Sequence, residues 1–332
     1  MLPDFMIKCE VIILKLLIVS REARASSLDT LFDGIAKHID TTIIKLTRAQ
    51  RIDFTNTVNQ LDHENYDRVM IDVPLSRIGK HYKVLRKISG LILYEQDAWM
   101  EFSKYSKYRN KFIKTYRSIG PCRLILTGCN VGERIRSAGL DVVAIPKSYD
   151  ENHLRNLHIE RDIELGYIGR IKTRAYRDRR PFLEKMVAEK GLQMLRTHPG
   201  EEYLQTLNRI KIFVSADIGF DEYMQKNFEA MACGCMLFAC RQGGKEEAWL
   251  GFRHMENVVL YDDMDDAQGK LDMLRENPGL VAEVARKGEE LVREHHTMGS
   301  RVKPYVEAIK AEMKPVQVLQ KPPSRWRRFF GG

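Results

Sequence analysis

Short apolar runs alternate with amphipathic stretches along the chain. The runs are dominated by Val, Ile, Leu and Met, as in 14–19 (LKLLIV), 68–73 (RVMIDV) and 122–127 (CRLILT). In the stretches between them, such as 27–38, apolar positions recur every three or four residues. Buried parallel strands read as continuous apolar runs, and the helices that cover them are amphipathic. The pattern therefore predicts an α/β protein built on parallel sheets.

The alternation occurs in two series, which indicates two domains in a chain of 332 residues. A polar segment with turn-forming residues, 146–155, separates them. We predict a first domain over 1–152, a second over 153–299, a helix 300–315 that returns to the first domain, and a basic aromatic tail over 316–332. The strands are expected at 14–19, 42–46, 68–73, 91–94, 122–127 and 142–145, then at 163–168, 192–195, 211–215, 236–239 and 258–261. In the second domain and beyond, helices are expected at 175–189, 201–207, 227–233, 265–275, 278–295 and 299–313.

The charge balance limits the partners. The chain has 54 Lys and Arg against 45 Asp and Glu, a net charge of +9. Such a surplus suits nucleic acid, a membrane surface or an anionic small substrate. The basic runs 104–123 and 170–180 carry no RNP aromatics, zinc-finger spacing or helix-turn-helix pattern, and such runs are usually solvated helix faces. We therefore expect no nucleic-acid partner.

Cysteines and the first apolar run bear on the cellular compartment. The six Cys include no CxxC pair or zinc-type spacing, so we expect reduced thiols in a cytoplasmic protein. The run 11–20 has about half the length of a membrane-spanning helix and carries Lys15 at its centre. Lys8 before it and 23–25 (ARA) after it are also features of a signal peptide. We favour a strand, because the fold needs one here.

Segment 221–239 (DEYMQKNFEAMACGCMLFA) is the most informative stretch for chemistry. Glu229 stands near the start of an expected helix that closes at Gly234 and leads into an apolar strand. The helix dipole stabilises an acid in this position, which is a sufficient structural reason for it. A carboxylate so close to a strand end can also accept hydrogen bonds from the two hydroxyls of a ribose. Both interpretations stay open on the residues alone.

This segment resembles the donor-site motif of the GT-B glycosyltransferases, in particular those of glycosyl transferase group 1. In that family an acidic residue, seven intervening positions and a Glu precede the helix end and strand. Asp221 and Glu229 have this spacing, although the first position is usually Glu. The resemblance implies two Rossmann-like domains facing each other across a cleft, with Glu229 on the ribose of a nucleotide sugar. It also makes Asp221 a catalytic candidate.

The resemblance extends over the second half of the chain. Segment 165–170 (LGYIGR) is similar to the family's first strand of the nucleotide domain, where a glycine turn runs past the diphosphate. Segment 294–301 (EHHTMGSR) resembles the signature where the last helix returns to the first domain, and we expect its histidines to be structural. A glycine lets the backbone approach a phosphate group closely, and Lys and Arg side chains supply the positive charge that balances the phosphate. The expected donor-binding residues are Gly169, Arg170, Lys172, Lys226, Asn227, Glu229, Gly243 and Gly244.

The first domain offers fewer candidates. Asp97 follows an expected strand and would face the cleft, where it could accept the proton of the acceptor hydroxyl or merely cap the next helix. Arg21, after the first strand, is a candidate phosphate or acceptor contact. Asp97, Asp221 and Arg170 form the catalytic set. We expect no cofactor and no essential metal, because helix dipoles, Arg and Lys can stabilise the leaving diphosphate.

The sequence thus favours a hexosyltransferase that moves a sugar from a nucleotide-diphosphate sugar to a hydroxyl of a glycan or lipid-linked glycan. The resemblance to the family implies a retaining reaction in cell-surface polysaccharide or lipopolysaccharide synthesis. The tail segment 326–330 (WRRFF) suits an anionic bilayer interface, which would place the protein peripherally on the inner face of the cytoplasmic membrane. The alternatives are a nucleotide-sugar epimerase or hydrolase of the same fold, and a non-catalytic basic protein that binds nucleic acid or membrane.

Overall fold

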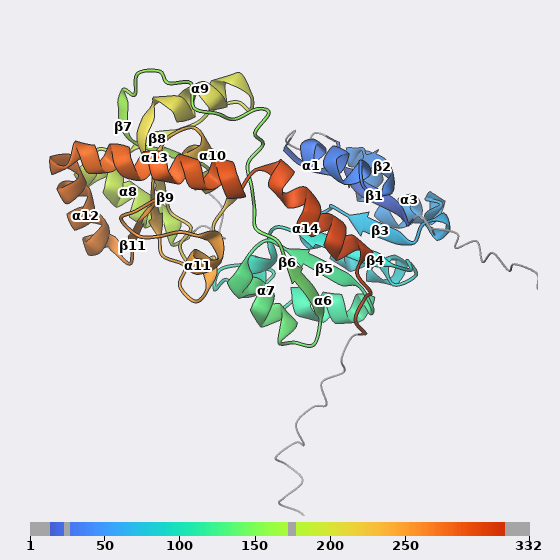
Figure 1. Ribbon diagram of the computed structural model, residues 1–332. Coiled ribbons are helices and arrows are strands. Elements are labelled where there is room, and N and C mark those ends of the chain that lie inside the picture. Colours follow the sequence, from blue (N-terminus) through green and yellow to red (C-terminus); the bar gives the residue numbers. More distant parts are fainter. Residues whose placement is uncertain (1–13, 23–26, 172–176, 316–332) are drawn as a thin grey trace, which may run out of the picture.

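A computed structural model describes residues 14–22, 27–171 and 177–315, which form two α/β domains (Figure 1). The first domain has a six-stranded sheet of order β2-β1-β3-β4-β5-β6, and the second a five-stranded sheet of order β11-β10-β9-β7-β8. All neighbouring strands are parallel. The predicted α/β fold is confirmed. The strands are β1 (Lys15–Arg21), β2 (Asp40–Leu46), β3 (Arg68–Ile71), β4 (Leu91–Glu95), β5 (Arg123–Leu126), β6 (Asp141–Ala144), β7 (Ile163–Ile168), β8 (Gln193–Leu195), β9 (Ile210–Ser215), β10 (Met236–Cys240) and β11 (Val259–Tyr261).

The first apolar run forms β1, which pairs with both β2 and β3 inside the sheet. Leu16 and Ile18 belong to the hydrophobic core on one face of this sheet, and Leu17 and Val19 to the core on the other. All four side chains are at most 1% exposed. Helices thus cover both faces, which explains why this strand reads as uninterrupted apolar sequence. The flanking residues 11–13 and 23–25 lie outside the described part of the chain.

Helices of different lengths cover the first sheet. The long ones, α1 (Ser27–Ala36) and α14 (Met298–Lys310), pack together on one face. Helix α14 is therefore the last helix of the described chain and lies on the first domain (Figure 1). The other face is covered mainly by short helices and turns, which are α2 (Arg48–Ile52), α3 (Phe54–Gln60), η1 (His63–Asn65), α4 (Leu75–Ile78), η2 (Gly79–His81), α5 (Tyr82–Leu85), η3 (Ala98–Glu101), α6 (Phe112–Ile119) and α7 (Cys129–Arg136).

The second sheet also lies between two helical layers. In β9, Ile212 and Val214 join one core, whereas Phe213 joins the other. Its helices are α8 (Arg179–Lys190), α9 (Glu201–Arg209), α10 (Gln225–Ala232), α11 (Glu246–Leu250), α12 (Met264–Glu276) and α13 (Pro278–His295). The expected strands and helices of this domain are present, with ends that differ from the expected bounds by a few residues.

Over residues 27–171 and 177–315 the chain passes between the domains twice, and the two crossings run side by side. The backbone N–H of Tyr149 donates to the carbonyl of His296 at 3.0 Å, and that of Met298 donates to the carbonyl of Tyr149 at 2.9 Å. The His296 ring is buried, with its Nε2 2.9 Å from the carbonyl of Leu250 and its Nδ1 in contact with the Arg301 guanidinium. These residues of the 294–301 segment therefore hold the connection between α13 and α14 in place.

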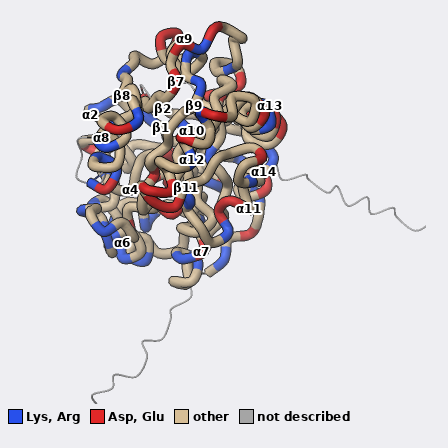
Figure 2. The backbone as a smooth tube through the Cα atoms, turned by 90° about the vertical axis from the view of Figure 1, so that its left-hand side faces the viewer, with Lys and Arg blue, Asp and Glu red and all other residues tan. Residues whose placement is uncertain are grey.

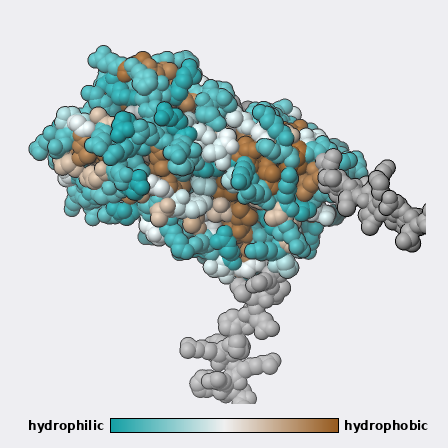
Figure 3. Space-filling view, viewed as in Figure 1, coloured by the Kyte–Doolittle hydropathy of each residue, from teal (hydrophilic) through white to brown (hydrophobic). Residues whose placement is uncertain are grey.

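The surface and the cysteines give no sign of a membrane-spanning or disulfide-linked structure in the described residues. No helix among them is long and apolar enough to cross a bilayer. The face seen in Figure 3 is largely hydrophilic, and hydrophobic residues gather on it mainly over the first domain. The five cysteines within the described ranges are free. The basic aromatic tail predicted over 316–332 lies outside these ranges, as does Lys172.

Candidate active site

A cleft of about 660 Å³ lies where the two domains meet, and both domains line it. Its charged residues stand at or just beyond the carboxyl ends of strands, because parallel sheets expose their loops at that edge. In the first domain these residues are Arg21 after β1, Asp72 after β3, Glu95 and Asp97 at the end of β4, and Lys147 after β6. In the second they are Arg170 after β7, Arg196 after β8 and Asp217 after β9, and the cleft is also lined by Arg179 and Lys226 at the starts of α8 and α10. The carboxyl edges of the two sheets therefore face one another.

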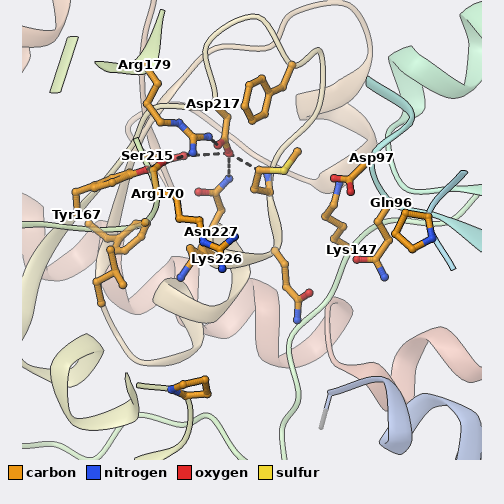
Figure 4. Close-up of a pocket in the computed structure, with 18 of the residues that line it drawn as sticks. Gln96, Asp97, Lys147, Tyr167, Arg170, Arg179, Ser215, Asp217, Lys226 and Asn227 are labelled. Carbon is orange, nitrogen blue, oxygen red and sulfur yellow. Dashed lines mark hydrogen bonds and ion pairs between the residues drawn. The ribbon is translucent and has the colours of Figure 1, made fainter. Parts of the chain in front are cut away.

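The second-domain wall carries a group of cations. Lys226, in the first turn of α10, lies near Arg170 in Figure 4, and Arg196 lines the same wall. Burial lowers the pKa of Lys226; Glu229 raises it, and the neighbouring arginines lower it further. Among the described residues, neither Arg170 nor Arg196 is paired with a carboxylate. The positive end of the α10 dipole adds to this potential, so the wall is suited to an anion.

The buried carboxylate of Asp217 holds the residues of this wall in position through hydrogen bonds. Its Oδ1 accepts from Arg179 Nη2 at 2.7 Å, and its Oδ2 accepts from Asn227 Nδ2 at 2.8 Å and from the backbone N–H of Met224 at 2.9 Å (Figure 4). Ser215 donates to the same Oδ2 at 3.1 Å. One buried carboxylate thus fixes the start of α10 against the end of β9. The sequence interpretation missed Asp217, although an acid two residues beyond an apolar strand was a visible signal.

Glu229 lies on α10, one turn after Lys226. The hydroxyl of Tyr203 donates to its carboxylate, and the Lys226 ammonium lies 4.6 Å from the centre of the Tyr203 ring. Burial raises the pKa of Glu229, and Lys226 opposes this shift. Glu229 is not among the described residues that line the cleft, whereas its neighbours Lys226 and Asn227 are. Its carboxylate can accept hydrogen bonds from a ligand that reaches the edge of α10.

The first-domain wall carries three acids, Asp72, Glu95 and Asp97, together with the cations Arg21 and Lys147. Glu95 is 2% exposed and accepts hydrogen bonds from the backbone N–H groups of Leu75 at 2.5 Å and Asp97 at 2.8 Å. Burial, and then the charge of Asp97, raises the pKa of Glu95 to about 8, so this carboxyl holds its proton at neutral pH. The side chain of Asp97 makes no capping hydrogen bond to the following helix η3 and lines the cleft instead (Figure 4). Asp97 is thus available to a bound molecule.

Three of the expected site residues lie elsewhere. Asp221 forms an ion pair with Arg134 of the first domain, and its backbone adopts φ +58°. The carbonyl of Gly243 accepts from Asn130 Nδ2 at 2.8 Å, and a Cβ atom at Gly244 would clash with Asn130 Oδ1. These three residues contact helix α7 and do not line the cleft. The expected site residues that do line it are Gly169, Arg170, Lys226, Asn227 and Asp97.

A buried contact beside the cleft joins the domains. The carboxylate of Glu222 is 2.8 Å from the Lys147 ammonium and accepts from Thr127 Oγ1 at 2.9 Å. Burial raises the pKa of Glu222, and Lys147 opposes the shift. The Trp99 and Phe220 rings stack at 3.9 Å between the same two domains. This contact fixes one edge of the cleft, and no sequence pattern predicted it.

Comparison with known proteins supports the fold. Residues 162–307 match the family described as "Glycosyl transferase-like". No curated protein matches the chain in sequence. Among solved structures, Anabaena Alr3699/HepE in complex with UDP and glucose is 13% identical, with a TM-score of 0.62 over 89% of this chain and 99% of that one. A Rickettsia africae glycosyltransferase is 10% identical, with a TM-score of 0.57 over 90% and 98%.

A third similar structure, trehalose-6-phosphate synthase OtsA, is 10% identical, with a TM-score of 0.57 over 90% of this chain and all of that one. The chain therefore has the GT-B fold, with two Rossmann-like domains facing each other across a cleft. The matching residues 162–307 span the second domain and most of α14, so the resemblance to glycosyltransferases is confirmed over that part of the chain.

Proposed function

We propose that the protein transfers a sugar from a UDP-sugar to an acceptor hydroxyl. The observation that carries this proposal is a set of cations on the second-domain wall, Arg170, Arg196 and Lys226, which line one interdomain cleft together with Asp97 of the first domain. A diphosphate between these cations would place the sugar toward the first domain. The uridine nucleotide is suggested by HepE, whose structures contain UDP and UDP-glucose.

In the proposed reaction, the bond from the sugar C1 to the diphosphate oxygen breaks, and a bond from the acceptor oxygen to C1 forms. Arg170 and Lys226 stabilise the negative charge that develops on the departing diphosphate, which usually contributes most to lowering the barrier. Asp97 accepts the proton of the acceptor hydroxyl. Glu229 holds the ribose hydroxyls. Since these cations supply the counter-charge, we propose that the reaction needs no metal and no cofactor.

Three finer assignments belong to this proposal. A retaining outcome rests on the spacing of Asp221 and Glu229. Hexosyl transfer to a glycan or lipid-linked glycan in cell-surface polysaccharide synthesis is proposed from the resemblance to the family. A peripheral position on the cytoplasmic membrane rests on the basic and aromatic residues of 326–330. The NMR-determined anomeric configuration of the product tests the first of these proposals.

Calorimetry with UDP, GDP, ADP, CMP and dTDP tests the donor site. We expect UDP to bind, with an affinity that EDTA leaves unchanged and that falls about tenfold or more in Lys226→Gln, because a charge-assisted contact to phosphate is lost. Arg180→Gln is the matched control, since Arg180 pairs with Glu184 at 2.7 Å and does not line the cleft. Absence of binding by every nucleotide would overturn the proposal.

Product analysis separates transfer from the alternatives. The intact protein is incubated with UDP-glucose, with and without a pool of saccharides, and the products are resolved by mass spectrometry. Transfer predicts a saccharide one hexose heavier and release of UDP. Turnover of the donor to an isomer or to free sugar without any acceptor would instead indicate an epimerase or hydrolase.

A further inference from the structure

A second groove lies in the first domain beside the donor cleft. It has a volume of about 1060 Å³ and is bordered by α2, by α4 with η2, and by the start of α6. Arg21, at the carboxyl end of β1, lines both the groove and the cleft. The groove and the cleft therefore adjoin at Arg21.

The groove is strongly basic. Of its fifteen lining residues, six are Lys or Arg and none is Asp or Glu. Besides Arg21, the cations are Arg48, Arg51, Arg77, Lys80 and Lys111. Within the described chain, none of these five forms an ion pair, although most cations on helices of the second domain do. Figure 2 shows Lys and Arg crowded at α6, which borders the groove. Uncompensated cations in a concave surface concentrate positive potential and attract anions.

The remaining wall suits a sugar. Tyr82, at the start of α5, and Tyr108, before α6, line this wall. The Tyr108 hydroxyl donates a hydrogen bond to the carbonyl of Ser76 at 3.1 Å. Aromatic rings offer an apolar face that can pack on the C–H face of a saccharide, and Thr115 and Ser76 add hydroxyl groups. The volume is in the range of small-ligand sites, which fits a short saccharide better than a nucleic-acid duplex.

We propose that this groove binds the acceptor, and that the acceptor is a saccharide carrying phosphate or carboxylate groups. The proposal rests on the proposed function, since it takes the adjoining cleft as the donor site. The anionic groups lie among Arg48, Arg77 and Lys111, and the reacting hydroxyl extends past Arg21 toward Asp97. Cations on the acceptor side thus select a charged substrate, while those around Lys226 hold the donor.

The test uses tetragalacturonate and its fully methyl-esterified form, which present the same sugars with and without charge. Calorimetry on the full chain is done at about 50 and about 300 mM NaCl. We expect the acid to bind about tenfold or more tightly than the ester at low salt, and this preference to shrink at high salt. A triple variant, Arg48→Gln, Arg77→Gln and Lys111→Gln, is expected to lose the preference while its UDP affinity is unchanged.

The control removes the same charge elsewhere, in Lys37→Gln, Lys87→Gln and Lys310→Gln, which are exposed and line neither groove nor cleft. We expect this control to bind like the wild type. Equal binding of acid and ester, or an unaltered preference in the groove variant, would overturn the proposal. So would binding of single-stranded DNA or phosphatidylglycerol vesicles without binding of tetragalacturonate. Failure of UDP to bind the wild type would overturn the donor site instead, so the two failures are distinguishable.

Discussion

Glu229 is the residue for which sequence and structure suggest the most specific contact. Its carboxylate lies one turn after Lys226 and already accepts one hydrogen bond from Tyr203. If it also holds both ribose hydroxyls, Glu229→Ala loses two charge-assisted hydrogen bonds, and UDP binding weakens by about 2–4 kcal/mol. Calorimetry with UDP measures this loss directly.

Deoxyribose provides the control for that measurement. The wild type should bind UDP more tightly than 2′-deoxy-UDP, and Glu229→Ala should bind the two equally, because the partner of the missing hydroxyl is gone. A variant that keeps the full preference for UDP would show that Glu229 does not hold the ribose. Tyr203→Phe, which removes only the existing hydrogen bond to Glu229, should retain most of that preference.

We predict that Glu95 makes donor binding dependent on pH. Burial and Asp97 raise its pKa to about 8, so it is neutral at pH 7 and becomes a carboxylate as the pH rises through about 8. A new negative charge on the cleft wall repels the diphosphate of the donor. We therefore expect the Kd of UDP-glucose to rise above about pH 8 in the wild type and to stay flat in Glu95→Gln. An equal rise in both proteins would assign the effect to another group.

Two adjacent acids in the segment before α10 have different surroundings. Glu222 is 1% exposed and pairs with the buried ammonium of Lys147, whereas Asp221 pairs with Arg134 at the surface. Glu222→Gln leaves a buried charge without its partner and should lower the free energy of unfolding by about 3 kcal/mol. Asp221→Asn should cost less than about 1 kcal/mol, because exposed pairs contribute little and Asn tolerates positive φ. Urea denaturation of the two variants compares them.

The same pair of variants bears on catalysis. Asp221 lies outside the described lining of the cleft, so we expect Asp221→Asn to transfer sugar at close to the wild-type rate. A fall of about a hundredfold in kcat with UDP-glucose would instead support the donor-sugar contact that the family spacing implies. Equal destabilisation by both substitutions would contradict the burial difference on which the comparison rests.

Sequence patterns predicted the strands and long helices because burial dictates their composition. In β1, alternate residues enter two different cores, so the whole strand must be apolar and is easily recognised. Helices α2 to α5 have only four to seven residues, too few for a helical period to show, and their ends depend on contacts with neighbours. These elements were not predicted, and α2, α4 and α5 line the basic groove of the first domain.

The site was predictable only in part, for a related reason. Gly169, Arg170 and Lys226 were found because a continuous segment carries each of them beside a strand or helix end. Arg179 and Asp217 are 38 positions apart and meet only after β7 and β9 pair. Gly243 and Gly244 had a suitable composition for a sugar contact, but the approach of Asn130 from the first domain places them in an interdomain contact. Contacts between domains leave no local pattern in the sequence.

For the molecule as a whole, the two parallel crossings determine how the domains are joined, and His296 lies buried between them. Burial and Arg301 lower the pKa of His296 to about 3, well below its value in an unfolded chain. Between about pH 6.5 and 3 the unfolded state thus binds a proton that the native state does not. The stability linked to His296 is complete above about pH 6.5 and decreases by about 1.4 kcal/mol for each unit that the pH falls.

We therefore expect the free energy of unfolding to drop by about 2 kcal/mol through this group between about pH 6.5 and about pH 5. His296→Gln removes the titrating ring, so its urea-denaturation midpoint should vary less with pH than that of the wild type, whatever its stability at pH 7. His295→Gln is the matched control, because the neighbouring ring is exposed and contacts only Glu294 among the described charged residues. If His296→Gln and His295→Gln keep the same acid dependence as the wild type, His296 is not the group that makes the joined domains sensitive to acid.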